Sequence, residues 1–393
     1  MKLPGDAAAR RARSPGVPPL VLHVVGDLHR GAVENWLIRM LAHARKRGAA
    51  VNWAFYCAFG GSGDLGAAAR ALGAPVVCSR VPIARKIDFI RALRAELRRG
   101  RYDVLHCHHD LVSAVYLFAS AGLSIRQRVV HAHNADEAVL TPSALKQRLY
   151  REPMRSVCLM MADRIVGISD HTLDTLLAGR PRRVGRDVVH YYGVDPAPFA
   201  SVKPNRAVFR RELDLPPDAL VLLFAGRIVP EKNPVFAVDV LFELRRVEPR
   251  AVAVFAGTGS LMEAVRERAR ELGVEPWIRL LGWRNDLAKV MCSSDLFILP
   301  RPERPMEGFG LAVVEAQLAG LRMLLSQGIP DDPLLPTASY RRLPLAAGAR
   351  EWAKAGVDLL TSPSTSRAAA LAALEKSQMQ MDRALDELLK LHE

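Results

Sequence analysis

The sequence predicts an α/β protein built from two doubly wound, Rossmann-like domains that face each other across a cleft. Short apolar runs of strand length alternate with amphipathic stretches of helix length along most of the chain. A polar, proline-rich segment interrupts this alternation once, and the alternation then starts again. The chain has 393 residues, half of them hydrophobic, which is enough for two domains that each bury a core. Because ligands bind beyond the carboxyl ends of the strands in such sheets, the substrate is expected between the two domains.

The first series of elements follows a basic N-terminal segment. Residues 1–18 carry basic residues, Ala, Pro and Gly without the apolar run of a secretory signal, and we expect a disordered tail there. Trp36, Leu37 and Leu41 recur at helical spacing after the first strand, which predicts a βα unit. Strands are predicted at residues 20–25, 51–55, 76–78, 104–106, 129–132, 164–168 and 188–191. These elements predict an N-terminal domain over residues 19–200.

A second series begins after a hinge at residues 195–205, which contain three prolines. Strands are predicted at residues 220–225, 251–256, 278–281, 296–299 and 322–325. Helices are predicted between them at residues 235–247, 261–272 and 311–319. We therefore expect a C-terminal domain over residues 201–365. The Ala- and Leu-rich residues 366–393 have helical periodicity and few breakers, and they predict one terminal helix.

Composition narrows the class of protein. No apolar run approaches the roughly 18 residues of a membrane span, so we expect a cytoplasmic protein that is soluble or peripheral on the inner membrane face. The five cysteines lie far apart, which favours reduced thiols over a disulfide framework. A net charge of +14 points to an anionic partner, such as a phosphate-bearing substrate, an anionic membrane surface or nucleic acid. An arginine-rich composition throughout the chain explains the same charge without any partner.

Two cations mark the loop after the predicted strand at residues 220–225. Arg227 and Lys232 lie five residues apart, between Gly226 and the start of a predicted helix at Pro234. The guanidinium of arginine can donate two hydrogen bonds to a diphosphate, and the ammonium of lysine can neutralise its charge. The N-terminus of a helix adds the positive end of its dipole. The alternative is a pair of solvated cations on a turn.

Two carboxylates bracket a glycine-rich turn after the predicted strand at residues 296–299. Glu307 and Glu315 are eight residues apart, with Gly308 and Gly310 between them. The glycines let backbone amides approach a ligand closely. Glu315 could accept hydrogen bonds from paired ribose hydroxyls, and Glu307 could accept one from a sugar or steady positive charge at the anomeric carbon. Alternatively, Glu307 is a turn residue and Glu315 a paired helix carboxylate.

Together these stretches, with Ser-Asp-Leu-Phe-Ile-Leu-Pro at residues 294–300, resemble the retaining GT-B glycosyltransferases of family 4, or group 1, and among them the capsule and exopolysaccharide enzymes. The resemblance spans about residues 20–340. It implies an N-terminal acceptor domain and a C-terminal domain that binds the nucleotide-sugar donor. It also implies a role for each site residue. Arg227 and Lys232 would bind the donor phosphates, and Glu307 would face the donor sugar and take part in catalysis. The backbone amides near Phe309, Gly310 and Leu311 would contact sugar or phosphate, and Glu315 would bind the ribose.

The N-terminal domain carries weaker signals. Gly31 lies in the loop between the first strand and the first helix, where the family places a glycine-rich loop over the donor phosphates. Similar enzymes carry a histidine near the reacting sugar at the end of a strand, and His133 matches that place. Many such turns contain glycine for geometric reasons alone, and His133 could equally be a buried structural histidine.

Residues 106–110 read His-Cys-His-His-Asp, a composition typical of metal ligands. Adjacent residues at a strand end point to opposite faces, and no second set of ligands is evident in the sequence. Members of the resembled family also generally lack a dedicated catalytic metal. We therefore expect no metal and no cofactor besides the nucleotide-sugar substrate.

The resulting functional prediction is retaining transfer of a hexose-type sugar from a nucleoside diphosphate to a hydroxyl of a glycan or lipid-linked glycan, in polysaccharide or other glycan assembly. Basic stretches at residues 85–101 and 146–155 could rest on anionic lipid. The alternatives are a GT-B nucleotide-sugar epimerase or phosphorylase and a catalytically silent, anion-binding partner protein. Nucleic acid is not expected as a partner, since a basic surface with stacking aromatics is lacking.

Overall fold

The computed structural model describes residues 17–29, 31–134, 144–362 and 366–393. They fall into two compact units, one formed by Met1–Gly193 with Met381–Glu393 and the other by Val194–Gln380. Most of the predicted N-terminal tail lies outside the described residues. None of the described helices combines the length and apolar character that crossing a bilayer requires.

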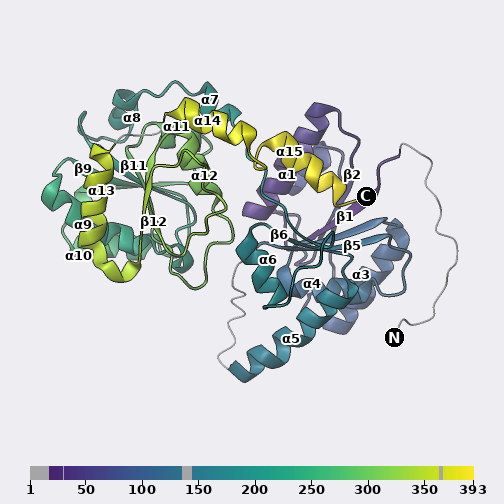
Figure 1. The fold of residues 1–393 in the computed structure, drawn as a ribbon. Coiled ribbons are helices and arrows are strands. Elements are labelled where there is room, and N and C mark those ends of the chain that lie inside the picture. Colours follow the sequence, from purple (N-terminus) through teal and green to yellow (C-terminus); the bar gives the residue numbers. More distant parts are fainter. Residues whose placement is uncertain (1–16, 30, 135–143, 363–365) are drawn as a thin grey trace. The chain divides into compact units, whose positions relative to one another are not determined.

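The described residues of unit 1 form a seven-stranded parallel sheet of order β3-β2-β1-β4-β5-β6-β7 (Figure 1). The strands are β1 (Leu20–Val25), β2 (Asn52–Cys57), β3 (Val76–Cys78), β4 (Val104–Cys107), β5 (Gln127–Ala132), β6 (Arg164–Gly167) and β7 (Asp187–Val189). Helices cover both faces of such a sheet, so its central strands are nearly continuous apolar runs, as in β1. The strand order reverses between β1 and β4, which is where ligands bind in doubly wound sheets.

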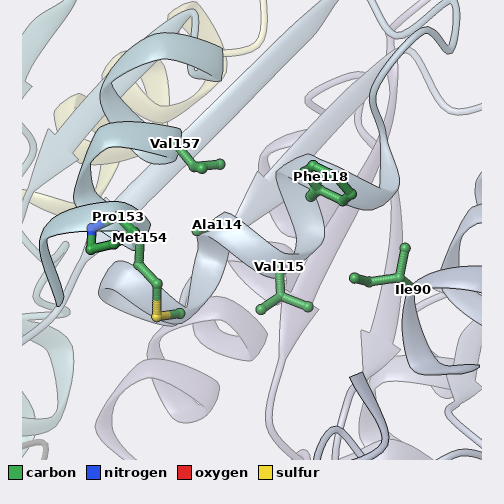
Figure 2. Close-up of a pocket in the computed structure, with 7 residues that line it drawn as sticks. All are labelled: Ile90, Ala114, Val115, Phe118, Pro153, Met154 and Val157. Atoms are coloured by element: carbon green, nitrogen blue, oxygen red, sulfur yellow. The ribbon is translucent and has the colours of Figure 1, made fainter. Parts of the chain in front are cut away.

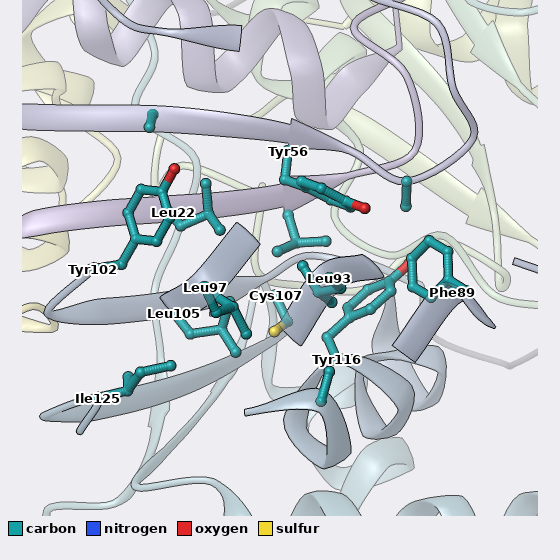
Figure 3. Packing of buried hydrophobic residues seen from close by; sticks show 14 residues of the cluster. Leu22, Tyr56, Phe89, Leu93, Leu97, Tyr102, Leu105, Cys107, Tyr116 and Ile125 are labelled. Carbon is teal, nitrogen blue, oxygen red and sulfur yellow. The ribbon is translucent and has the colours of Figure 1, made fainter. Parts of the chain in front are cut away.

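Different helices cover the two faces of this sheet. The helices of unit 1 are α1 (Ala32–Arg47), α2 (Gly66–Ala71), α3 (Lys86–Gly100), α4 (Ser113–Ala119), α5 (Ala144–Met161), α6 (Asp170–Leu177) and α15 (Met381–Lys390). On one face, Phe89 and Leu93 of α3 and Tyr116 of α4 pack with Leu22 and Leu105 in an apolar core (Figure 3). On the other face, α1 and α15 contact each other and cover a group of histidines described below.

Unit 2 repeats the architecture with a six-stranded parallel sheet of order β10-β9-β8-β11-β12-β13. Its strands are β8 (Leu220–Ala225), β9 (Ala251–Ala256), β10 (Ile278–Gly282), β11 (Leu296–Leu299), β12 (Arg322–Ser326) and β13 (Tyr340–Leu343). Its helices are α7 (Ala197–Ser201), α8 (Arg206–Glu212), α9 (Pro234–Val247), α10 (Met262–Glu271), α11 (Leu287–Cys292), α12 (Leu311–Leu318), α13 (Gly348–Thr361) and α14 (Arg367–Lys376). The strand order reverses between β8 and β11. The two parallel sheets confirm the predicted fold class.

The end of the chain differs from the prediction of a single helix over residues 366–393. The structure has two helices, because the backbone at Ser377 turns extended, with φ −85° and ψ 164°, and the Ser377 hydroxyl donates to the Leu374 carbonyl at 2.8 Å. The first helix, α14, belongs to unit 2, and the second, α15, belongs to unit 1. The boundary between the units also falls after Gly193, a few residues earlier than the predicted boundary after residue 200.

Candidate functional site

The two stretches singled out by the sequence lie in the loops that follow β8 and β11. These are neighbouring strands on either side of the strand-order reversal in unit 2. In parallel sheets the carboxyl ends of adjacent strands meet at one edge, and ligands bind there. The topology therefore brings the Arg227 loop and the Glu307 loop to one place.

The loop after β8 is shaped by its backbone. Gly226 has a φ of 148°, and a short 3₁₀ turn at Pro230–Lys232 ends at Asn233 with a φ of 51°. Pro234 then begins α9, where its missing N–H costs nothing. This path leaves the Arg227 side chain exposed and the Lys232 side chain 15% exposed.

Glu307 binds two cations at once. Its carboxylate pairs with the Lys232 ammonium, and Arg301 Nη1 donates to the same Oε2 atom at 3.0 Å. Arg301 also donates to the carbonyls of Pro305 at 2.9 Å and Met306 at 2.8 Å, so its guanidinium holds the loop as well as the carboxylate. The Glu307 backbone N–H donates to the Gly328 carbonyl at 2.8 Å. Glu307 is thus fixed both through its side chain and through its backbone.

The charges at this edge are buried and unequal in number. The side chains of Arg301 and Glu307 are 9% and 13% exposed. Burial alone would raise the pKa of Glu307, but Lys232 and Arg301 outweigh this effect and hold the pKa below its ordinary value. Burial also lowers the pKa of Lys232, against the attraction of Glu307. Lys232 and Arg301 thus pair with one carboxylate, and the exposed Arg227 adds a third positive charge that acts on Lys232 and Glu307 from a greater distance. The surplus positive charge suits an anion such as a diphosphate.

The glycine-rich turn after Glu307 leads into α12. Gly310 has a φ of 97°, which favours glycine, and a Cβ there would lie 3.5 Å from Glu307 Cγ. Phe309 is buried in the core, so only its backbone could meet a ligand. Leu311 begins α12, and Glu315 lies half-buried one turn later. The structure therefore places Phe309, Gly310, Leu311 and Glu315 on one continuous turn and helix start beside Glu307.

Sequence reasoning missed Arg301 and a second glycine loop. Arg301 directly follows Pro300 at the end of an apolar strand and precedes Glu307 by six residues, which was the available signal. Gly257 and Gly259, after β9, let two loops approach closely, since a Cβ on Gly257 would lie 1.9 Å from the Gly226 carbonyl oxygen. The Ile228 N–H donates to the Thr258 carbonyl at 2.9 Å and thereby fixes the loop that carries Arg227.

In unit 1, Gly31 caps the start of α1. Its backbone φ is −87°, and a Cβ there would meet the Glu34 carboxylate, 2.1 Å from Oε2. The Gly31 carbonyl accepts from the Asn35 side chain at 2.8 Å. The local geometry thus gives Gly31 a capping role, and phosphate binding by this loop stays a prediction.

His133 is 7% exposed, and both of its ring nitrogens are engaged within the protein. Nε2 lies 3.0 Å from His108 Nδ1, and Nδ1 lies 2.8 Å from the Tyr192 hydroxyl. Contact with a reacting sugar requires one of these bonds to open. A catalytic role for His133 therefore stays a prediction.

One reason given above for expecting no metal near residues 106–110 is wrong. His106 and His108 are two residues apart and lie on the same face of the sheet, and the structure places further imidazoles beside them. His131 lies on the neighbouring strand β5, His133 directly follows that strand, and His23 lies on β1. The sequence could not show this second set, because strand register brings it there.

Comparisons with known proteins agree with the geometry. The family model described as glycosyl transferases group 1 matches residues 205–330, and the model described as glycosyltransferase family 4 matches residues 33–198. A D-inositol 3-phosphate glycosyltransferase of Kribbella flavida is 31% identical over 320 residues, 75% of this chain and 72% of the relative. The UDP-Gal:alpha-D-GlcNAc-diphosphoundecaprenol alpha-1,3-galactosyltransferase of Escherichia coli is 27% identical over 269 residues, covering 65% of this chain and 66% of its own. Glycosyltransferase EpsF of Bacillus subtilis is 24% identical over 344 residues, with coverage of 85% and 86%.

Other sequence relatives are matched over only part of their length, and similarity to a solved structure supports the fold. The alignments span 54% and 52% of the D-inositol 3-phosphate glycosyltransferases of Streptomyces bingchenggensis and Mycolicibacterium gilvum, so this chain matches about half the length of those relatives. The crystal structure of Anabaena HepE in complex with UDP superimposes with a TM-score of 0.76 at 18% identity, over 94% of this chain and 98% of HepE.

Proposed function

We propose, since the chain belongs to the glycosyltransferases of group 1 and family 4, that it transfers a hexose-type sugar from a nucleoside diphosphate to an acceptor hydroxyl with retention of anomeric configuration. The observation that carries the proposal is the pairing of Glu307 with Lys232 and Arg301 at the strand-order reversal of unit 2. Its surplus of positive charge is the feature that a departing nucleoside diphosphate needs.

In this proposal the donor lies across the loops after β8 and β11. Arg227 and Lys232 hold the phosphates, and the developing charge on the leaving group is stabilised by cations already in place. The amides at Phe309, Gly310 and Leu311 lie at the start of α12, where the positive end of the helix dipole favours the oxygens of a phosphate or sugar. Glu315, on the same helix, accepts from the ribose hydroxyls.

Glu307 acts on the donor sugar rather than as a covalent nucleophile. Two cations already neutralise its carboxylate and hold its pKa low, which weakens it as an attacking group and keeps it ionised. An ionised, fixed carboxylate can accept from a sugar hydroxyl and stabilise positive charge at the anomeric carbon. No dedicated metal is required, because Arg227 and Lys232 supply the positive charge that a metal would otherwise bring.

A transfer assay tests this function. The full chain is incubated with UDP-, GDP- or ADP-sugars and a lipid-linked glycan acceptor, and the anomeric configuration of the product is read by NMR. We expect an α-linked product from an α-linked donor, and Glu307→Gln should abolish its formation while the exposed Glu303→Gln does not. An inverted product would contradict retention, and conversion of the donor sugar without any acceptor would indicate an epimerase instead.

The acceptor is proposed to be a lipid-linked glycan used in polysaccharide assembly. The E. coli relative is named for a diphosphoundecaprenol-linked acceptor, and EpsF of B. subtilis is another relative. Such an acceptor is anchored in a bilayer, so an enzyme that modifies it has to approach the membrane surface.

Unit 1 carries a surface suited to that approach. An apolar groove lies between α3, α4 and α5, lined by Ile90, Ala114, Val115, Phe118, Pro153, Met154 and Val157 (Figure 2). The side chains of Ile87, Phe118, Leu149 and Met160 are 59% to 78% exposed on the same helices. Lys86 on α3 lies 4.3 Å from the ring of Tyr150 on α5. Exposed arginines continue along α3, whereas on α5 Arg148 is exposed and Arg155 is buried. The structure does not describe the side chains of residues 146 and 147, with which the predicted basic stretch at 146–155 begins.

We propose that this surface rests on anionic lipid on the cytoplasmic face of the inner membrane. Exposed apolar side chains with cations around them are the combination that binds an anionic lipid interface. Flotation of the full chain with vesicles tests this: vesicles containing phosphatidylglycerol should retain the protein, and added salt or the paired change Ile87→Ser and Met160→Ser should release it. Equal flotation with purely zwitterionic vesicles, or none with either kind, would contradict the proposal.

A further inference from the structure

A group of buried histidines lies on the face of the unit 1 sheet opposite the core of Figure 3. His23 on β1 is in register with His106 on β4, and His131 lies on the adjacent β5. His108 and His133 follow two residues after His106 and His131, so they point to the same face. All five are at most 7% exposed, and Trp36 of α1 packs edge-on against His131 at 5.6 Å between ring centroids.

The imidazoles form two hydrogen-bonded rows. In the first row, Tyr192 contacts His133, His133 contacts His108, and His108 Nε2 lies 3.0 Å from His23 Nδ1. In the second row, His392 Nε2 lies 2.9 Å from His106 Nδ1, and His106 Nε2 lies 3.2 Å from His131 Nδ1.

Each row ends in a buried nitrogen without a partner among the described residues. These atoms are His23 Nε2 in the first row and, at the two ends of the second row, His131 Nε2 and His392 Nδ1. A neutral imidazole carries one N–H and one lone pair, so each row has to leave either a donor or an acceptor unsatisfied. Buried polar groups in that state are costly and indicate a missing partner, such as an ion or an ordered water.

We propose that His108, His131 and His133 bind a nitrogen-preferring transition-metal cation of the Zn²⁺ class. The ligand atoms of these three residues lie within 4.8 Å of one another. His108 Nδ1 and His133 Nε2 are 3.0 Å apart, close to the roughly 3.3 Å that separates two nitrogens on one tetrahedral zinc. The third ligand is His131 Nε2, the nitrogen that otherwise lacks a partner.

The surrounding groups fit this assignment. With the metal in place, His133 Nδ1–H donates to the Tyr192 hydroxyl, His108 Nε2–H donates to His23 Nδ1, and His131 Nδ1–H donates to His106 Nε2. Each ligand then has a hydrogen-bonded second nitrogen, which is the usual arrangement around metal-bound histidine. Each ring also keeps one proton, so all three bind as neutral ligands.

Charge and burial favour the same class of cation. The rings of His108, His131 and His133 are buried, and burial disfavours the charged form of an imidazole. The ligand set is imidazole only, without the carboxylates that Mg²⁺ and Ca²⁺ prefer. The proposed ligands lie on or directly after β4 and β5. The hydrogen bond between His106 and His392 links this group to the residues that follow α15.

The test is a titration of the full chain, carrying no added histidine tag, after treatment with a chelator. Co²⁺ is added at pH 7.5, and its visible absorption and the metal retained after dialysis are measured. We expect one equivalent per chain with the d–d absorption of a low-symmetry nitrogen site. Retention of no metal, or a thiolate-to-cobalt charge-transfer band, would overturn the proposal, the second because it would place the metal on a cysteine.

Variants locate the site independently. His131→Gln should abolish stoichiometric binding, whereas His43→Gln, which removes a histidine that pairs with Asp382 between α1 and α15, should leave it unchanged. Tyr192→Phe keeps the ring but removes the proposed acceptor for His133, and it should weaken Co²⁺ binding about 10- to 100-fold. This variant decides the matter if His131→Gln does not fold. Binding by Tyr192→Phe that equals binding by the wild type would contradict the assignment.

Discussion

The two sheets reverse their strand order at equivalent places, between β1 and β4 in unit 1 and between β8 and β11 in unit 2, yet the side chains there differ in kind. In unit 2, cations surround the Glu307 carboxylate. In unit 1, imidazoles fill the face under β1, β4 and β5, and burial keeps them neutral. Paired charges with a positive surplus suit an anion, whereas neutral lone pairs suit a metal cation. The same backbone topology thus supports opposite ligand chemistry.

The largest expected effect comes from removing the charge at the centre of the unit 2 group. Glu307→Gln leaves the Lys232 ammonium and Arg301 without their shared partner and removes the carboxylate that is proposed to face the donor sugar. We expect kcat/KM for transfer to fall about 100-fold or more. Release of the nucleoside diphosphate measures this, with exposed Glu303→Gln as the matched control. Equal rates for the two variants would remove Glu307 from the mechanism.

Arg301 tests the structural side of the same group. Arg301→Ala removes one of the two cations paired with Glu307 and the donor to two loop carbonyls. Because Lys232 still pairs with the carboxylate, we expect the free energy of unfolding to fall by about 1.5–3 kcal/mol, as for a lost hydrogen bond to a charged group. Urea denaturation of the variant measures the loss. The nearby, exposed Arg304→Ala should unfold like the wild type, and a similar loss in both variants would show that the loop, not the ion pair, was disturbed.

Glu315 should affect nucleotide affinity more than stability. In Glu315→Gln the neutral amide replaces the proposed charged acceptor for the ribose hydroxyls, and hydrogen bonds to charged groups contribute about 1.5–3 kcal/mol. We therefore expect roughly 10- to 100-fold weaker binding of the nucleoside diphosphate by calorimetry. Glu351→Gln, an exposed change on α13, is the control. Unchanged affinity in Glu315→Gln would place the ribose elsewhere.

The smallest expected effect is that of divalent cations on the initial rate of transfer. Because Arg227 and Lys232 are proposed to supply positive charge to the phosphates, omission of Mg²⁺ and Mn²⁺ should change the rate by less than about twofold. The rate is measured with and without a chelator, within minutes of its addition. A strict requirement for either ion would mean that the donor site depends on a metal after all.

Sequence reasoning placed the central strands well for a physical reason. β1, β8, β9 and β11 begin and end at the predicted residues, since strands buried on both faces are nearly continuous apolar runs, interrupted in β1 by His23. It missed β13, where Tyr340, Arg341 and Arg342 form an edge strand that carries no such run. It also merged α14 with α15, because neither glycine nor proline marks the break at Ser377.

The candidate site was only partly readable for a related reason. Arg227, Lys232, Glu307 and Glu315 stand out locally, as charges next to glycines after strands. The partnership of Glu307 with Arg301 depends on how the loop folds back, which no spacing rule supplies. The group of buried histidines in unit 1 is even harder to predict from the sequence. His23, His108 and His133 are far apart in the sequence, and strand register together with a two-residue offset along each strand brings them to one face.

A calorimetric titration of the full chain with UDP, GDP and ADP, run beside Arg227→Ala and Arg304→Ala, tests the central claim most directly. The account predicts that one of these nucleotides binds at a single site, that Arg227→Ala weakens it about 10-fold or more through the lost charged hydrogen bonds to phosphate, and that Arg304→Ala does not change it. Binding of no nucleotide, or equal affinity in both variants and the wild type, would contradict a donor site at the strand-order reversal of unit 2.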